Sequence, residues 1–248
     1  MADVLLASYE ELVSRWRDLS TPSREAHVNG FVLNYAYNSG KIENDAITYH
    51  DTHEVFENGR IIAFTGDVRT LFEIQNLKTS WEWARPLAAS GLRLTEDLVL
   101  KAHELLTYGT YDEQRWESGE RPGSYKLGDY VVGAKAVGAD ASDVPELMRD
   151  LLGDVSAYLS DDTRALTVAA YLHAVLVDIH PFADGNGRVA RLLMNMVLLS
   201  MGHPPVVIRE QDRMAYYGAL DAFHDEGDLE PFKQFLMTEC LITWEGRL

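Results

Sequence analysis

The chain has 248 residues, of which 46% are apolar, and its formal net charge is −17. The apolar fraction excludes a globally disordered chain, and the length fits one large domain. The negative charge argues against nucleic acid or an anionic membrane as the main partner. A site for any anionic ligand would therefore need cations placed locally around it.

A single cysteine, Cys240, excludes an internal disulfide and fits a reducing compartment. The opening residues, MADVLLASYEELVSRW, lack a basic region and acquire charges early, so we expect no signal peptide. No apolar run reaches the ~20 residues that span a bilayer. We therefore expect a soluble cytoplasmic protein.

Hydrophobic spacing predicts a mostly helical fold. Residues 1–20 are predicted to form a helical appendage, and residues 21–248 a single compact domain. Thr21 is expected to cap a helix whose first residue is Pro22 and which continues to about residue 42.

Two further helices are predicted over 68–84 and 95–106, with Thr95 as the N-cap of the second. From 118 to 144 glycines recur and β-branched residues alternate, which indicates an irregular loop containing a short β-hairpin.

The remaining chain again shows helical patterns, without repeats or linkers. One of these helices is apolar nearly all round and is expected to be the buried centre of the fold. The predicted helices cover residues 144–159, 162–177 (the central one), 192–201, 212–223 and 230–241. The predicted fold class is therefore all-α with a small hairpin.

The segment His180-Pro-Phe-Ala-Asp-Gly-Asn-Gly-Arg-Val-Ala-Arg191 joins two strongly apolar stretches. Its glycine-rich turn presents backbone N–H groups at the start of a helix, which is how proteins hold phosphate. Arg188 and Arg191 are three residues apart, share one helix face, and can both grip an anion.

Asp184 is a hard oxygen ligand that suits Mg²⁺, and His180 titrates near neutrality, as a general base should. Together these residues describe phosphoryl-type chemistry on a magnesium nucleotide. Phe182 is interpreted as a packing anchor and His173 as a core residue. His50 and His53 lie among acidic residues without a helical apolar frame, a weak pattern for a metal site.

The segment 180–191 resembles the signature of the Fic family, HxFx(D/E)GNGRxxR, at every specified position. This resemblance implies an all-α Fic-type domain with a small β-hairpin flap. It also implies transfer of AMP from ATP, with Mg²⁺, to a Ser, Thr or Tyr hydroxyl of a target protein.

The resemblance assigns a role to each signature residue. His180 deprotonates the incoming hydroxyl, and Asp184 holds Mg²⁺. Arg188 contacts the β-phosphate and Arg191 the γ-phosphate. The anion hole is formed by three successive residues, Gly185, Asn186 and Gly187.

The segment Ser39-Gly-Lys-Ile-Glu43-Asn44 fits the family's inhibitory motif, (S/T)xxxE(G/N). In similar proteins this helix, here about residues 22–44, lies over the active site and its glutamate pairs with the second signature arginine. Glu43 and the ATP γ-phosphate would then compete for Arg191. The alternative is that Glu43 is a solvated residue near a helix end.

Gly123-Ser-Tyr-Lys126 resembles the family's GxYR element, with lysine in place of arginine. The hairpin that follows resembles the family's flap, and its edge could pair with an extended target segment. The flap residues are Tyr130, Val131, Val132 and Gly133. Tyr216 and Tyr217 fit an adenine pocket or core packing equally well.

Three functions stay open on sequence alone: AMP transfer restrained by Glu43, the reverse removal of AMP with the same residues, and a silent binding module. Transfer of another nucleotide monophosphate is a further alternative. Modification of the chain itself and homo-oligomerisation stay open as well, and no sequence pattern identifies the target protein.

Overall fold

The computed structural model describes residues 2–59, 61, 64–132 and 135–248. Almost all of the regular structure is α-helical. In chain order the helices and strands are α1 (Ala2–Asp18), α2 (Thr21–Glu43), α3 (Tyr49–Asn58), α4 (Val68–Ala89), α5 (Glu96–Thr107), α6 (Glu113–Glu117), β1 (Tyr130–Val132), β2 (Lys135–Val137), α7 (Val144–Tyr158), α8 (Ala165–Ile179), α9 (Asn186–Ser200), α10 (Arg213–Glu226) and α11 (Glu230–Trp244), with 3₁₀ turns at Asp162–Arg164 and Glu210–Asp212.

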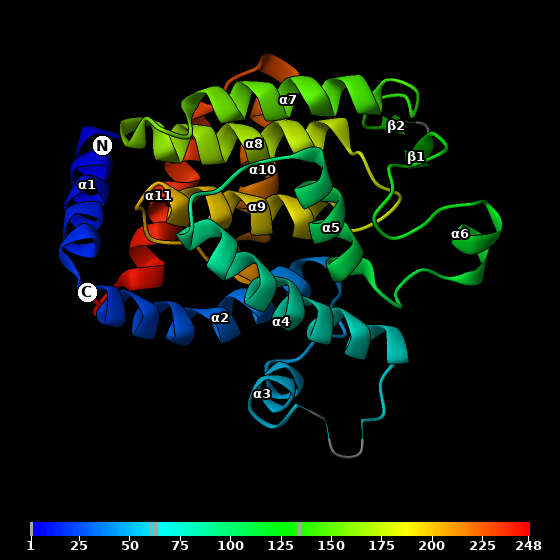
Figure 1. The fold of residues 1–248 in the computed structure, drawn as a ribbon, viewed down its shortest axis with the longest axis horizontal. Helices are drawn as coiled ribbons and strands as arrows, with labels where there is room; N and C mark the ends of the chain where they lie inside the picture. Colours follow the sequence, from blue (N-terminus) through cyan, green and yellow to red (C-terminus); the bar gives the residue numbers. More distant parts are fainter. Residues whose placement is uncertain (1, 60, 62–63, 133–134) are drawn as a thin grey trace.

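The centre of the fold is the pair α8 and α9, which lie side by side with α7 running along α8 (Figure 1). Leu172 and Leu176 of α8 and Leu192 and Val197 of α9 are fully buried. Helices α4, α5 and α11 cover the remaining sides of this pair. The apolar pattern that predicts a buried central helix is thus confirmed, and the turn between α8 and α9 is held by a rigid core.

Helix α1 packs against α11 and adds its apolar face to the same core. Tyr9 and Trp16 are buried, and the Trp16 ring lies 4.9 Å from that of Trp244, between centroids. The N-terminal helix therefore shares its packing with the C-terminal one, and the two ends of the chain lie on the same side (Figure 1).

Most helix predictions are confirmed, including Thr95 as an N-cap, whose hydroxyl accepts from Leu98 N at 3.2 Å. The N-cap of α2 lies one residue before the predicted one, Thr21. Ser20 caps this helix by accepting from Ser23 N, and Thr21 is its first residue.

Two helices differ from the sequence prediction in ways that matter for the site. Helix α9 begins at Asn186, six positions before the predicted residue 192, so most of the glycine-arginine segment is helical. Helix α3 forms where no helical frame was expected. Thr48 caps it and Gly59 ends it in a left-handed conformation, two signals that outweigh its mixed polarity. His50 and His53 are both exposed on it.

The predicted hairpin is confirmed as two antiparallel strands, with Tyr130 paired to Val137 and Val132 to Lys135. Gly133, which was assigned to the flap, and Ala134 lie outside the described residues. The hairpin and α6 lie at the end of the molecule that carries the α8–α9 turn (Figure 1).

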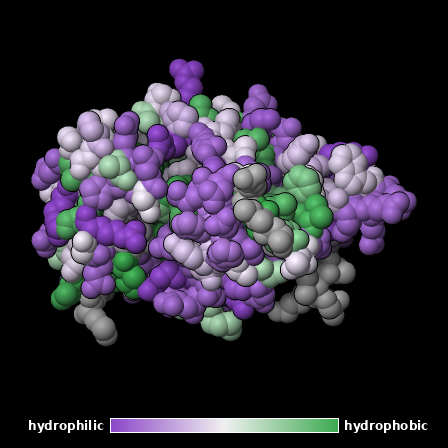
Figure 2. All heavy atoms as spheres, turned by 90° about the horizontal axis from the view of Figure 1, so that it is seen from below, coloured by the Kyte–Doolittle hydropathy of each residue, from purple (hydrophilic) through white to green (hydrophobic). Residues whose placement is uncertain are grey.

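None of the helices in the described part of the chain combines the length and apolar character that a membrane span needs. The face shown in Figure 2 is mostly hydrophilic, in keeping with the high negative charge of the chain.

Candidate active site

The turn between α8 and α9 begins at His180, whose φ is 51°. Among the residues that the structure describes, it is the one non-glycine residue with a positive φ. Such strain costs of order 1–3 kcal/mol and persists only where neighbours enforce it. Ala139 N donates to Ile179 O at 3.0 Å, and a Cβ on Gly138 would lie 2.3 Å from the His180 Cβ. The backbone of Gly138 and Ala139, directly after the hairpin, is thus in close contact with Ile179 and His180.

Asn186 and Phe182 close the turn. The Asn186 amide accepts from Phe182 N at 2.9 Å and donates to Phe182 O at 2.8 Å. Phe182 is fully buried, which confirms its role as a packing anchor. The Asn186 side chain is therefore engaged within the loop, and its backbone N–H at the start of α9 is the group that can face an anion.

His103, on α5, joins three parts of this site, although it was not recognised in the sequence. Its ring stacks on Phe182, with centroids 3.8 Å apart. Its Nδ1 accepts from Gly123 N at 2.9 Å, which places the proton on Nε2, 3.1 Å from the Asp184 carbonyl oxygen. Burial lowers the pKa of His103 to about 3, so the ring is neutral. His103 fixes the backbone of the turn.

The Asp184 carboxylate lies among positive and N–H groups. Oδ1 accepts from Gly185 N at 2.6 Å and from Arg188 Nη2 at 3.1 Å, and Oδ2 accepts from Arg69 Nη2 at 2.7 Å. Burial alone would raise the pKa of Asp184, but Arg188 and Arg69 outweigh it and hold the pKa below its usual value. The carboxylate is thus ionised at neutral pH.

Arg188 is 2% exposed, and two of its nitrogens, Nε and Nη1, have no hydrogen-bond acceptor among the described residues. Nη1 lies 3.8 Å from Glu73 Oε1, beyond hydrogen-bond distance. Leaving buried charged donors unpaired costs free energy, so this position favours an anion that supplies acceptors.

Arg191 and Glu43 form an ion pair, with Arg191 Nη2 2.7 Å from Glu43 Oε1. Arg191 is 2% exposed and the Glu43 side chain is 34% exposed. Ser39 contributes two further contacts: its hydroxyl accepts from Arg191 Nε and its carbonyl from Nη2, each at 2.9 Å. Arg191 is thus held by both ends of the Ser39–Glu43 motif.

Gly187 provides the space for this ion pair. A Cβ at that position would lie 2.4 Å from Glu43 Oε1 and 3.0 Å from Arg191 Nη1. On α2, a Cβ on Gly40 would meet Ile47 at 2.7 Å and Leu77 of α4 at 3.0 Å. Gly187 thus allows α2 to approach the start of α9 closely, and Gly40 allows α2 to pack closely against α4.

Tyr216 and His173 continue the hydrogen-bond network of Arg191. Tyr216 OH accepts from Arg191 Nη1 at 3.4 Å and lies 3.1 Å from His173 Nε2. Burial lowers the pKa of His173 well below its ordinary value, so the neutral ring accepts the tyrosine proton. His173 is fully buried, as predicted, and Tyr216 is buried whereas Tyr217 is exposed.

Comparison with known proteins assigns this arrangement to a family. The Fic/DOC family model matches residues 93–198, from α5 to α9. The chain is 30% identical over 231 residues to "Protein adenylyltransferase Fic" of Drosophila persimilis, which covers 93% of this chain and 43% of that protein. The protein of the same name in Drosophila willistoni is 31% identical over 82% of this chain and 39% of its own length. The chain is a Fic-domain protein.

Solved structures share the fold of this Fic-domain protein. A Fic domain containing signaling protein from Bacteroides thetaiotaomicron superposes with a TM-score of 0.81 at 23% identity, over 95% of this chain and 93% of the other. Fic-1 (residues 134–508) of C. elegans gives 0.74 at 23% identity, over 96% and 69%. The all-α Fic fold is thereby confirmed. The chain spans less than half the length of the curated relatives it matches.

Lys126 fastens the signature loop of the Fic domain to the hairpin. Its backbone N donates to Pro181 O at 2.9 Å, and its Nζ donates to Val137 O at 3.3 Å. Burial of the His180 ring, followed by the positive charge of Lys126, lowers the pKa of His180, against smaller opposing effects from Val177 and nearby carboxylates. His180 is therefore neutral at pH 7 and able to accept a proton.

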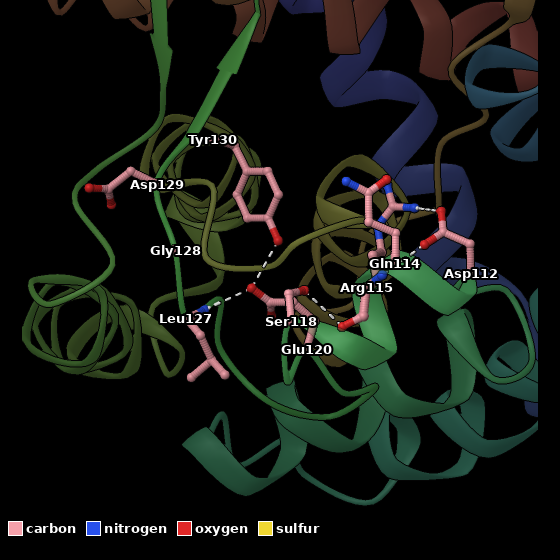
Figure 3. Close-up of a pocket in the computed structure, with 9 residues that line it drawn as sticks. All are labelled: Asp112, Gln114, Arg115, Ser118, Glu120, Leu127, Gly128, Asp129 and Tyr130. Atoms are coloured by element: carbon pink, nitrogen blue, oxygen red, sulfur yellow. Dashed lines mark hydrogen bonds and ion pairs between the residues drawn. The ribbon is translucent and has the colours of Figure 1, made fainter.

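Glu120 anchors the first strand of the hairpin. Its Oε1 accepts from Leu127 N at 2.9 Å and from Tyr130 OH at 2.8 Å (Figure 3). Glu120 is 2% exposed and lies beside a cavity of about 520 Å³ that Asp112 and Asp129 also line. The Tyr130 hydroxyl thus holds the first strand of the hairpin against Glu120.

Proposed function

We propose that this chain transfers AMP from ATP to a Ser, Thr or Tyr hydroxyl of a target protein. The proposal is supported by curated relatives that are named protein adenylyltransferases. The observation that carries it is a neutral, half-buried His180 on the turn directly before α9, whose first turns carry two buried arginines, Arg188 and Arg191. That combination offers a base and an anion site in one loop.

His180 accepts the proton of the target hydroxyl. The hydroxyl oxygen forms a bond to the α-phosphorus as the bond from that phosphorus to the bridging oxygen breaks. Pyrophosphate leaves with that electron pair, and the target retains AMP on its side chain. The lowered pKa of His180 keeps the ring in the accepting form at neutral pH.

The start of α9 holds the phosphates. The backbone N–H groups of Asn186 and Gly187 can donate to the anion at this helix N-terminus, whereas the Gly185 N–H donates to Asp184 Oδ1 in this conformation. Arg188 supplies the donors that have no acceptor within the described residues and serves the β-phosphate. Arg191 serves the γ-phosphate once Glu43 has left it.

Asp184 fits a divalent cation by chemistry, since it is an ionised carboxylate beside the phosphate site. In the structure both of its oxygens accept from guanidinium or N–H groups, so a cation must replace at least one of them. We assign Asp184 as the residue that holds Mg²⁺ with ATP. Bound Mg²⁺ would neutralise phosphate charge, which favours departure of pyrophosphate.

The described conformation represents the inhibited enzyme. Glu43 occupies Arg191 at 2.7 Å, so a γ-phosphate at the same guanidinium must displace a carboxylate of the same charge sign. ATP bound without that contact places its α-phosphorus off the line of attack, and such misplacement removes much of the rate. Ser39 and Asn44 hold the end of α2 that carries Glu43.

The hairpin is the proposed docking element for the target. The backbone of strand β1, including Val131 and Val132, can pair with an extended segment and hold its hydroxyl near His180. The single thiol, Cys240, is buried and fits a reducing compartment such as the cytoplasm.

The function is tested with Glu43→Gly protein, a cell lysate as the source of targets, Mg²⁺, and ATP labelled either at the α- or at the γ-phosphate. AMP transfer predicts protein bands that carry the α label and not the γ label, and His180→Ala in the same background should remove them. Bands that carry only the γ label would indicate phosphoryl transfer instead.

Two further outcomes address the remaining alternatives. A band at the size of the chain itself reports self-modification. If α-labelled proteins lose their label faster with wild-type protein than with Glu43→Gly protein, the site removes AMP and Glu43 takes part in that reaction. Absence of any α label from ATP, with label from another nucleotide, would change the base assignment.

A further inference from the structure

Arg69, on α4, lies against the signature loop from a distant part of the sequence. Its Nη2 is 2.7 Å from Asp184 Oδ2, across a separation of 115 residues. Asp184 Oδ1 accepts from Gly185 N and from Arg188 Nη2. The carboxylate therefore already has a positive partner on Oδ2, the oxygen that the loop itself leaves free.

Arg69 is positioned by a buried carboxylate. Its Nε donates to Glu73 Oε1 at 3.0 Å, and the Glu73 side chain is 4% exposed. Glu73 Oε2 accepts from Asn44 Nδ2 at 2.6 Å, and Asn44 also donates to Thr70 Oγ1 at 3.1 Å. Glu73 thus links Asn44, which follows Glu43 at the end of α2, to Arg69, which pairs with Asp184.

Arg69 and Arg188 differ in their freedom to leave Asp184. The Arg188 side chain is 3% exposed and is enclosed by the start of α9, whereas Arg69 is 37% exposed. Arg69 Nη2 can release Asp184 while Nε stays on Glu73, because water that reaches this partly exposed guanidinium replaces the one hydrogen bond that is lost. Arg69 is therefore the partner of Asp184 that another cation can replace.

We propose that Arg69 occupies the cation position at Asp184 in the resting protein and that the divalent cation of the nucleotide binds by displacing it. The proposal rests on the proposed function, which assigns the metal to Asp184. A divalent cation on Oδ2 would be repelled by the guanidinium that lies 2.7 Å away, so its binding favours departure of Arg69. Arg69 then acts as a positioning residue that sets how much divalent cation the site needs.

The size of the effect follows from the exposure of the pair. Ion pairs that water reaches are worth up to about 1 kcal/mol, which corresponds to a change of about two- to fivefold in a binding constant. Removing Arg69 should therefore lower the Mg²⁺ concentration that the site needs by about two- to fivefold. A lysine at this position keeps a positive charge and should leave that concentration near the wild-type value.

The test measures binding rather than turnover. The affinity for α,β-methylene-ATP, from which AMP cannot be released, is measured by calorimetry over a series of Mg²⁺ concentrations in the Glu43→Gly background. Arg69→Gln is compared with Arg69→Lys and with Arg85→Gln, which removes an arginine from the same helix that contacts Asn29 instead. Free Mn²⁺ measured by electron paramagnetic resonance gives the cation occupancy directly.

The expected result is a Mg²⁺ midpoint about two- to fivefold lower in Arg69→Gln, with Arg69→Lys and Arg85→Gln close to the parent. An unchanged or higher midpoint in Arg69→Gln would overturn the inference while leaving Asp184 as the metal ligand. Asp184→Asn provides the separate check on the function. If this variant keeps the parent's Mg²⁺ dependence, the metal assignment fails and the inference fails with it.

Discussion

Glu43 and Arg191 are 148 residues apart in the sequence, yet Glu43 Oε1 lies 2.7 Å from Arg191 Nη2. The arginine is almost fully buried and the glutamate is one-third exposed. The pair therefore has one fixed partner and one that water, or a competing anion, can reach. This asymmetry makes Glu43 the replaceable member.

Ser39→Ala is expected to loosen the inhibitory pair. Arg191 Nε donates to the Ser39 hydroxyl in a buried position, so the substitution leaves a charged donor unpaired and should cost about 1–3 kcal/mol of unfolding free energy. AMP incorporation should rise, but less than in Glu43→Gly. Urea unfolding and label incorporation measure the two effects. Ser80→Ala serves as the control, because within the described part of the chain this buried hydroxyl donates only to Leu77 O of its own helix.

His180→Ala in the Glu43→Gly background should lower the transfer rate by about 10²–10⁴-fold. Nucleotide affinity should change little, because the base acts on the hydroxyl and not on ATP. Single-turnover rates and calorimetry with α,β-methylene-ATP separate the two quantities. Transfer at the parent rate would remove His180 from the role of base.

The pH dependence of transfer follows from the pKa of His180. The ring must be neutral to accept a proton, and its pKa lies below the ordinary value of 6.5. Transfer should therefore be nearly constant above pH 7 and fall only as the pH drops through a midpoint below 6.5.

Lys126→Met should move that acidic midpoint upward, because it removes a positive charge that disfavours protonated His180. Rate profiles from pH 5 to 8 for the parent and the variant measure the shift, with Lys101→Met, an exposed substitution that removes a pair with Glu104, as the control. A midpoint that stays in place or moves down would exclude Lys126 as a cause of the low pKa.

Gly138→Ala should impair transfer by disturbing His180. The glycine has a φ of +75°, and a Cβ there would lie 2.3 Å from the His180 Cβ and 2.5 Å from Ile179 O. The backbone must shift, so we expect at least about a tenfold loss of rate with a smaller loss of nucleotide affinity. Gly128→Ala, which meets open space, should behave like the parent in both assays.

The local elements of this fold are legible in the sequence, whereas the contacts between distant elements are not. Thr95 and the apolar spacing of 165–177 predict α5 and α8, because caps and periodicity act within one turn. The pairing of Glu43 with Arg191 was expected only through a family motif.

Arg69 and His103 carry no comparable local signal. Arg69 and Glu73 form an i, i+4 pair of the kind found on any exposed helix, and His103 occupies an ordinary buried position on α5. Their contacts with Asp184 exist only because α4 and α5 pack against α9. Such contacts depend on tertiary packing, which single-sequence patterns do not contain.

The central claim is that Glu43 restrains AMP transfer by occupying Arg191. It predicts more incorporation in Glu43→Gly than in wild type, low incorporation in Arg191→Ala, and a double variant that resembles Arg191→Ala. The double variant is not additive because both residues act through one interaction. Lys41→Gly introduces the same helix-weakening glycine near the end of α2 while keeping the carboxylate, and should not activate.

The most direct measurement is incorporation of α-labelled AMP into protein by these five forms of the chain, side by side, with ATP and Mg²⁺. We predict strong labelling with Glu43→Gly and little with wild type, Lys41→Gly, Arg191→Ala or the double variant. Equal labelling by wild type and Glu43→Gly, or strong labelling by the double variant, would contradict the account.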